Sequence, residues 1–142
     1  MTIGAILKTK GGEIITLPST ASVRDAVALL AERRIGAVPV VDDGRVAGIF
    51  SERDVTYCIA REGAAALDRS LAEVMTTSVQ TVTATDAVIA GLSLMTRRRI
   101  RHLPVVDGET LVGFVSIGDL VKFRIDRIEA DAAAMRDYIQ QA

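Results

Sequence analysis

The sequence predicts an α/β (α+β) protein in which two β-α-β-β-α repeats pack as a pseudo-two-fold pair, followed by an extended C-terminal helix. One stretch occurs twice, 65 residues apart and without a gap, as RRIGAVPVVD at 33–42 and RRIRHLPVVD at 98–107. Each copy runs on to a second shared signature, GIFSERD at 48–54 and GFVSIGD at 113–119. A repeat of about 60 residues alone would bury only a marginal fraction of its surface, so we expect the copies to share one folded unit.

The first repeat follows from local sequence patterns. Its expected elements are a strand at 14–17, a helix from Val23 to about 35, a strand at 37–41, a turn at 42–45, a strand at 46–50 and a helix at 52–61. Gly36 is expected just past the first helix, where glycine is favoured. Pro39 requires an edge or bulge position, because proline donates no hydrogen bond to a sheet. Ser51 is a good N-cap for the second helix.

The second repeat is expected to contain the same elements in the same order. These are a strand at 79–82, a helix at 87–100, a strand at 102–106, a turn at 107–110, a strand at 111–115 and a helix from 117. A connector of small and charged residues joins the copies at 62–70. We therefore expect repeat 1 at 3–62, repeat 2 at 71–125 and a helical extension at 126–142.

The last helix continues beyond the repeat with a heptad pattern. Its apolar positions are spaced alternately by four and three residues, and they are Val121, Ile125, Ile128, Ala132, Met135 and Ile139. The seam can lie back on its own domain or form a dimer contact, and the sequence leaves both interpretations open. We expect a homodimer that brings four repeats into a flat disc, and on the second interpretation the seam contributes to its interface.

Composition limits the function classes. The formal net charge is −1, and aromatic and basic residues do not alternate, so a nucleic-acid partner is not expected. No apolar run approaches the roughly 20 residues of a membrane-spanning helix, and the first residues do not resemble a signal peptide. The single cysteine, Cys58, excludes an intramolecular disulfide and a cysteine-cluster metal site. We expect a cytoplasmic protein.

The sequence does not indicate an enzyme. His102 is the only histidine, so it has no histidine companion for a metal site. Cys58 has no reactive setting and is expected to be a small buried side chain. Glycine-rich phosphate loops of the known types are absent from the sequence. We therefore expect no catalytic residues, no metal and no catalytic cofactor.

Two Ser-x-x-Asp elements are the main candidates for binding chemistry, namely Ser51 with Asp54 and Ser116 with Asp119. Each follows a strand and opens a helix, and this spacing alone favours a capping box, in which serine and acid satisfy free backbone N–H groups. A carboxylate at such a place can also accept hydrogen bonds from the two vicinal hydroxyls of a ribose. Arg53 adjoins Asp54 and could reach a phosphate.

The two signatures, in this order and spacing, resemble a tandem pair of CBS domains, named for cystathionine β-synthase. The resemblance covers about residues 3–125. It implies that the two sheets pack face to face and form two clefts that bind adenosine nucleotides such as AMP, ADP, ATP, NAD or S-adenosylmethionine. It places the ribose at Asp54 and Asp119, with Ser51 and Ser116 near the phosphate or ribose. The other positions that it implies around the ligand are Thr16, Pro18, Ala37, Val38, Pro39, Arg53, Val82, Thr83, Arg101, His102, Leu103 and Pro104.

The sequence therefore predicts a non-catalytic regulatory module whose ligand is an adenosine nucleotide of the AMP, ATP or NAD type. The two clefts are not expected to be equivalent, because Glu52-Arg53 in the first copy is replaced by Ile117-Gly118 in the second. The alternative is a dimeric protein-interaction module without a nucleotide. A third possibility is an accessory subunit of an enzyme. An effector protein is expected, but the sequence does not identify it.

Overall fold

The computed structural model describes all residues from Met1 to Ala142. Its helices are α1 (Ile3–Lys10), α2 (Val23–Arg33), α3 (Glu52–Glu62), the 3-10 helix η1 (Gly63–Asp68), α4 (Leu71–Val74), α5 (Val88–Arg98) and α6 (Ile117–Gln141). Its strands are β1 (Ala37–Asp42), β2 (Arg45–Ser51), β3 (His102–Asp107) and β4 (Thr110–Ser116). The predicted mixture of helices and strands, the repetition and the long last helix are confirmed.

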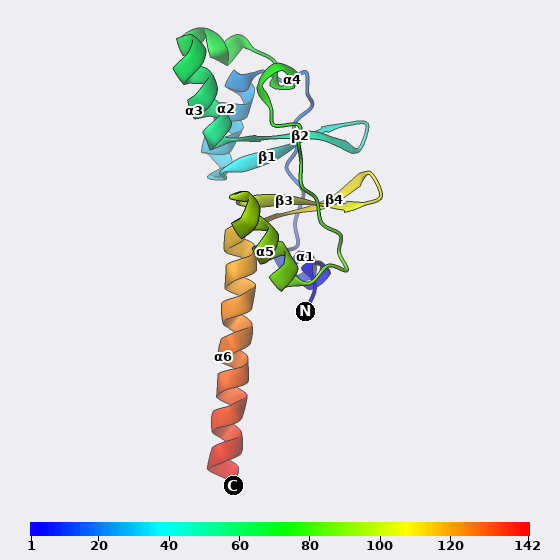
Figure 1. Cartoon of the computed structure of the whole chain (residues 1–142), viewed down its shortest axis with the longest axis vertical. Helices are drawn as coiled ribbons and strands as arrows, with labels where there is room; N and C mark the ends of the chain where they lie inside the picture. The colour runs from blue at the N-terminus through cyan, green and yellow to red at the C-terminus, as the bar shows by residue number, and fades with distance from the viewer.

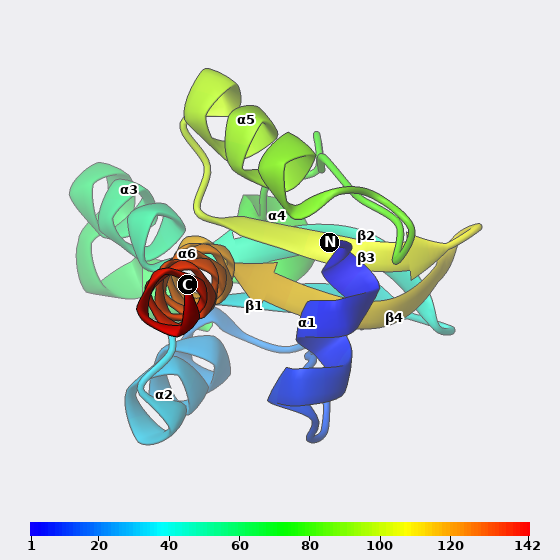
Figure 2. The ribbon, with the colours of Figure 1, turned by 90° about the horizontal axis from the view of Figure 1, so that it is seen from below.

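The strands form two antiparallel hairpins, β1–β2 and β3–β4, in a sheet of order β1-β2-β4-β3. The hairpins are joined by the single pair Arg45 and Thr110, next to their turns. Figure 1 shows the two hairpins side by side, and Figure 2 shows α2 and α5 on opposite sides of the strands. β1 and β3 are the outer strands, so Pro39 and Pro104 occupy the edge positions that proline requires.

The first strand of each repeat is shorter than the sequence predicts. Leu17 and Val82 each form one parallel bridge, to Val40 and Val105 respectively, and no longer strand forms at 14–17 or 79–82. The residue after each bridge explains the limit. Pro18 has no N–H group to donate, and the N–H of Thr83 donates to the carboxylate of Asp86 at 2.8 Å.

The end of the first helix also differs from the prediction. Arg34, rather than Gly36, adopts the left-handed conformation, with φ of 54°. The N–H of Ile35 then donates to the carbonyl of Leu30 at 3.1 Å, which closes the helix before Gly36 is reached. Arg99 repeats this geometry after α5, with φ of 53°. The repeat therefore includes this unusual helix ending.

Each repeat has its own apolar core, and each core is completed by a short helix from the other repeat. Ile3 and Ile6 of α1 belong to the core of the second repeat, with Met95, Leu103 and other residues. Leu71 of α4 belongs to the core of the first repeat, which also contains the buried thiol of Cys58. Because the chain crosses between the cores in this way, neither repeat can keep its complete core when it is separated from the other.

Helix α6 projects well beyond the body of the molecule (Figure 1). Its first residues pack on the second core through Leu120 and Phe123. The apolar seam lies exposed along the helix, with exposed fractions of 48% at Ile125 and 66% at Ile139. The interpretation that the seam lies back on its own domain is therefore wrong. None of the helices combines the length and the apolar composition needed to cross a membrane.

Candidate functional site

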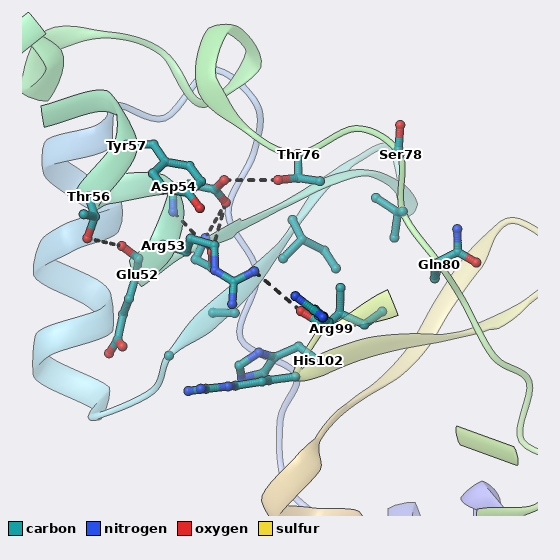
Figure 3. Close-up of a pocket in the computed structure, with 17 residues that line it drawn as sticks. Glu52, Arg53, Asp54, Thr56, Tyr57, Thr76, Ser78, Gln80, Arg99 and His102 are labelled. Atoms are coloured by element: carbon teal, nitrogen blue, oxygen red, sulfur yellow. Dashed lines mark hydrogen bonds between the residues drawn. The ribbon is translucent and has the colours of Figure 1, made fainter. Parts of the chain in front are cut away.

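A cleft of about 680 Å³ lies between the two repeats (Figure 3). It is lined from the first repeat by Gly36, Ala37, Ile49, Ser51, Glu52, Arg53, Asp54, Thr56 and Tyr57. On the other side it is lined by the crossing segment, which comprises residues 75–81 between α4 and the bridge at Val82, and by the end of α5 and the start of β3. These residues are Thr76, Ser78, Val79, Gln80, Arg99, Ile100, Arg101 and His102. The N-terminus of α3 and the approach to β3 thus face each other across this space. Because both repeats form the walls, a ligand here would bridge them.

Asp54 is half-buried in this cleft, at the first turn of α3. Its Oδ2 accepts hydrogen bonds from the backbone N–H of Ser51 at 2.9 Å and from the Ser51 hydroxyl at 3.1 Å. Its Oδ1 accepts from the hydroxyl of Thr76 at 3.1 Å. The predicted capping box is therefore present. The cap uses Oδ2, so Oδ1, with only the Thr76 hydroxyl on it, remains able to accept a further hydrogen bond.

Asp119 occupies the matching position of the second repeat, but its surroundings differ. Its Oδ2 accepts from the N–H of Ser116 at 2.8 Å, which completes the same kind of cap. The ammonium of Lys10, on α1, also donates to this oxygen at 2.9 Å and to the carbonyl of Phe114 at 2.9 Å. Partial burial raises the pKa of Asp119, but the Ser116 N–H and the Lys10 ammonium outweigh it and hold the pKa below its ordinary value.

Three arginines give the cleft a cationic wall. Arg53 reaches from α3 toward the second repeat, where its guanidinium lies 3.5 Å from the carbonyl oxygen of Arg99. Arg99 and Arg101 line the opposite side. Glu52 and Asp54 are the only acids among the lining residues, so the wall carries one net positive charge. Such a group of guanidinium forks is suited to phosphate oxygens.

His102 lies between the two Ser-x-x-Asp elements. Its ring stacks on Phe114, with centroids 5.5 Å apart and planes 11° from parallel. Burial lowers the pKa of His102, while the nearby charges of Asp119 and Glu52 oppose those of Lys10 and Arg101. The imidazole is therefore held in its neutral form, in which one ring nitrogen donates a hydrogen bond and the other accepts one.

The structure brings six of the predicted ligand-binding residues together in the cleft, namely Ala37, Ser51, Arg53, Asp54, Arg101 and His102. The others lie elsewhere. Val38, Leu103 and Val82 have their side chains in the two cores, and Pro39 and Pro104 are buried beside them. Thr16 and Pro18 flank the outer bridge to β1, Thr83 lies in the turn before α5, and Ser116 and Asp119 form the second cap.

Sequence reasoning missed the segment that crosses between the repeats. Thr76, Ser78, Val79 and Gln80 line the cleft, and Thr76 contacts Asp54 directly. The backbone of Thr76 also pairs with Ile49 of β2 through two hydrogen bonds of 2.9 Å. This pairing holds the crossing segment beside the first repeat. Both Thr76 and Ser78 are polar residues that precede the strand expected at 79–82, and a search for polar residues in that stretch would have found them.

Two solved structures with this fold contain adenosine compounds. A CBS domain protein from Pyrobaculum aerophilum, complexed with AMP, is 29% identical, and the match covers 84% of this chain and 89% of that one with a TM-score of 0.74. The CBS domain pair of protein MJ0100, in complex with 5-methylthioadenosine and S-adenosyl-L-methionine, is 26% identical over 89% of this chain and 98% of that one, with a TM-score of 0.79.

Other relatives are closer in sequence. The CBS-domain protein ATU1752 from Agrobacterium tumefaciens is 38% identical, covers 87% of this chain and 99% of its own, and superposes with a TM-score of 0.83. The mitochondrial CBS domain-containing protein CBSX3 of Arabidopsis thaliana is 32% identical over 98% of this chain and 72% of its own length. The family model for the CBS domain matches twice, at residues 4–61 and 71–126. The chain therefore belongs to the CBS-domain family and carries two CBS domains in tandem.

Proposed function

We propose that this chain is a non-catalytic regulatory module that binds one adenosine nucleotide in the cleft at Asp54. The observation that carries the proposal is the carboxylate of Asp54, which faces a cleft walled by both repeats while its Oδ1 contacts only the Thr76 hydroxyl. The vicinal hydroxyls of a ribose would donate to this carboxylate. The adenosine compounds bound by two structural relatives support a ligand of this class.

The charge of the cleft favours phosphorylated ligands such as AMP, ATP or NAD. Arg53, Arg99 and Arg101 would attract a phosphate or pyrophosphate group. They would repel the sulfonium of S-adenosylmethionine, which carries a positive charge beside the adenosine. The neutral imidazole of His102 offers a flat surface and both kinds of hydrogen-bonding nitrogen to a base.

The second Ser-x-x-Asp element is proposed to be the weaker site. A ribose at Asp119 would have to share Oδ2 with the Lys10 ammonium or displace it. No arginine follows Ser116 in the position that Arg53 holds after Ser51. A ligand at Asp119 therefore meets an acid already neutralised by the chain itself.

Binding would report on the relation between the repeats. The Asp54 cap belongs to the first repeat, whereas Arg101 and His102 belong to the second, so a nucleotide that contacts both sides links them. If the repeats take two relative arrangements, a ligand shifts the population toward the arrangement that binds it more tightly. An effector protein that recognises one arrangement would then respond to the nucleotide.

The alternative function is a dimeric interaction module that has no nucleotide ligand. The exposed seam of α6 is the observation that favours it. Mass spectrometry of small molecules released from the denatured, freshly purified protein separates the two functions. An adenosine nucleotide in stoichiometric amount supports the sensor. Its absence, together with no binding of added AMP, ATP or NAD at millimolar concentration, supports the interaction module.

Replacing Arg53 by alanine tests the phosphate side of the cleft. Loss of a charged hydrogen bond costs roughly 1.5–3 kcal/mol, which corresponds to about tenfold or more in affinity. We expect Arg53→Ala to weaken AMP, ATP or NAD by this amount, and adenosine much less. Arg61→Ala is the matched control, because Arg61 lies on the same helix but does not line the cleft. Equal losses for adenosine and its phosphates would contradict the role of Arg53.

A further inference from the structure

The exposed seam of α6 runs along a face that the body of the protein does not use. Leu120 and Phe123, which pack on the second core, lie on the opposite side of the helix from Val121 and Ile125. From Val121 to Ile139 the seam extends about 27 Å at 1.5 Å per residue. A continuous apolar row of this length, exposed to water, is typical of an interaction surface.

The charges that flank the seam have a definite order. In the heptad, Ile125, Ala132 and Ile139 take position a, and Val121, Ile128 and Met135 take position d. Positions g then hold Arg124, Asp131 and Tyr138, and positions e hold Lys122, Glu129 and Arg136. These e and g residues are exposed, and a second helix could reach them. Lys122 and Asp131 also form exposed ion pairs within α6, with Asp126 at 3.2 Å and Arg127 at 3.7 Å respectively. Charges at e and g set partner choice and orientation in coiled coils.

We propose that two copies of this chain pair through α6 as a parallel, in-register coiled coil. In that arrangement a g residue faces the e residue five positions further along the other helix. Arg124 then faces Glu129 of the partner subunit, and Asp131 faces Arg136 of the partner subunit. Both pairs have opposite charges, and each occurs twice in the dimer. The occupant of the seam is therefore a second copy, identified by its own charge pattern.

The antiparallel arrangement that uses all six apolar layers has the wrong charges. In this arrangement the two helices cross at residue 130, and the g positions of one helix lie beside the g positions of the other, as do the e positions. Asp131 then lies near Asp131 of the partner subunit, and Glu129 lies near Glu129 of the partner subunit. Like charges in such positions are destabilising. The parallel arrangement uses the same apolar layers without this repulsion.

A pair of alanines on α6 allows a direct test by disulfide formation. Ala132 is at position a, where parallel helices place it against Ala132 of the partner subunit. Ala130 is at position f, on the outer face. In the antiparallel arrangement the two copies of residue 132 are offset by four residues across helices 8–10 Å apart, which puts their Cα atoms about 10 Å apart, beyond the roughly 7 Å limit for a disulfide.

We expect Ala132→Cys to form a disulfide-linked dimer under mild oxidation and Ala130→Cys to remain unlinked. The native thiol of Cys58 is buried, so the wild-type protein gives the background. Light scattering of the reduced proteins should give the mass of a dimer for all three. A monomeric mass, equal cross-linking of both variants, or a dimer in which Ala132→Cys does not cross-link would each overturn the proposal.

A charge exchange tests the same pairing without a covalent bond. Glu129→Arg places a cation opposite Arg124 of the partner subunit and should raise the dissociation constant about two- to fivefold for each of the two affected pairs. The double variant Arg124→Glu, Glu129→Arg should restore the wild-type constant. A double variant that remains as weak as the single one would overturn the parallel pairing. The result does not depend on nucleotide, so it is independent of the proposed function.

Discussion

Gly48 packs against Met75 and Thr76, and Thr76 lines the cleft, so a substitution at Gly48 should affect both stability and the cleft. A Cβ at this position would lie 2.7 Å from the Thr76 carbonyl oxygen and 2.7 Å from the Met75 sulfur. The methionine side chain can move, but the Thr76 carbonyl accepts a hydrogen bond from the N–H of Ile49 at 2.9 Å and is part of the backbone bridge to β2. Gly48→Ala must therefore displace the crossing segment that carries Thr76.

The expected cost follows from two opposing effects. Overpacking a tight site costs typically about 1–3 kcal/mol. Alanine also restricts the unfolded chain, which returns about 0.4–1 kcal/mol, because φ at Gly48 is not positive and alanine is not strained there. We expect Gly48→Ala to lower the free energy of unfolding by about 1–2 kcal/mol. The shift of Thr76 should also disturb its 3.1 Å contact with Asp54 and weaken nucleotide binding.

Gly113→Ala is the matched control, because Gly113 occupies the same position in the second repeat. Its Cβ would meet the side chain of Leu7 at 2.6 Å, and the three atoms nearest to it all belong to that side chain. Urea unfolding of both variants measures stability, and calorimetry with AMP measures binding. Both should be destabilised, but only Gly48→Ala should lose affinity beyond its effect on folding. An unchanged stability of Gly48→Ala would contradict the tight contact at this position, and an equal loss of affinity in both variants would contradict its effect on the cleft.

Three further outcomes are expected. Lys10→Met should lower the free energy of unfolding by less than about 1 kcal/mol, because the ion pair with Asp119 is half exposed. In the wild type, protonation of Asp119 below about pH 4 breaks that pair, so the variant should lose less stability in this range. Acid unfolding curves measure both effects. The wild type should lose stability as the pH falls below about 6.5, because the His102 imidazole takes up a proton there in the unfolded chain, while burial lowers its pKa in the folded one. His102→Phe should remove this loss. Identical pH profiles of the free energy of unfolding for the two proteins would contradict it. Ile128→Asp should weaken self-association about tenfold or more, because pairing would bury the new carboxylate in the apolar seam without a partner. Sedimentation equilibrium at several concentrations measures the dissociation constant, and an unaffected dimer would contradict this prediction.

Most of the fold could be predicted because the chain carries its pattern twice. The hairpins, the helices and the Ser51 and Ser116 caps all follow from short-range signals that agree between the copies. The exchange of α1 and α4 between the cores could not be predicted, because Ile3 and Leu71 are apolar residues that either core could bury. Only the three-dimensional path of the chain decides which core takes which helix.

The candidate site could be predicted in part for the same reason. Asp54, Arg53 and His102 stand within repeated signatures and meet in the cleft. Thr76 lies outside the repeated signatures, and its role depends on the pairing of its backbone with Ile49 across the crossing. The contact of Lys10 with Asp119 joins residues that are 109 positions apart in the sequence, so no local pattern predicts it. That contact adds to the difference between the two Ser-x-x-Asp elements, which the sequence already indicates through Arg53 and Gly118.

Calorimetry of AMP, ATP and NAD with Asp54→Asn and Asp119→Asn, beside the wild type, tests most directly whether Asp54 holds a nucleotide. Asparagine keeps much of the capping ability of aspartate, so both variants should remain folded. We expect one nucleotide per chain in the wild type, a loss of affinity of about tenfold or more in Asp54→Asn, and little change in Asp119→Asn. Unchanged affinity in Asp54→Asn, or an equal loss in the two variants, would contradict a nucleotide site at Asp54.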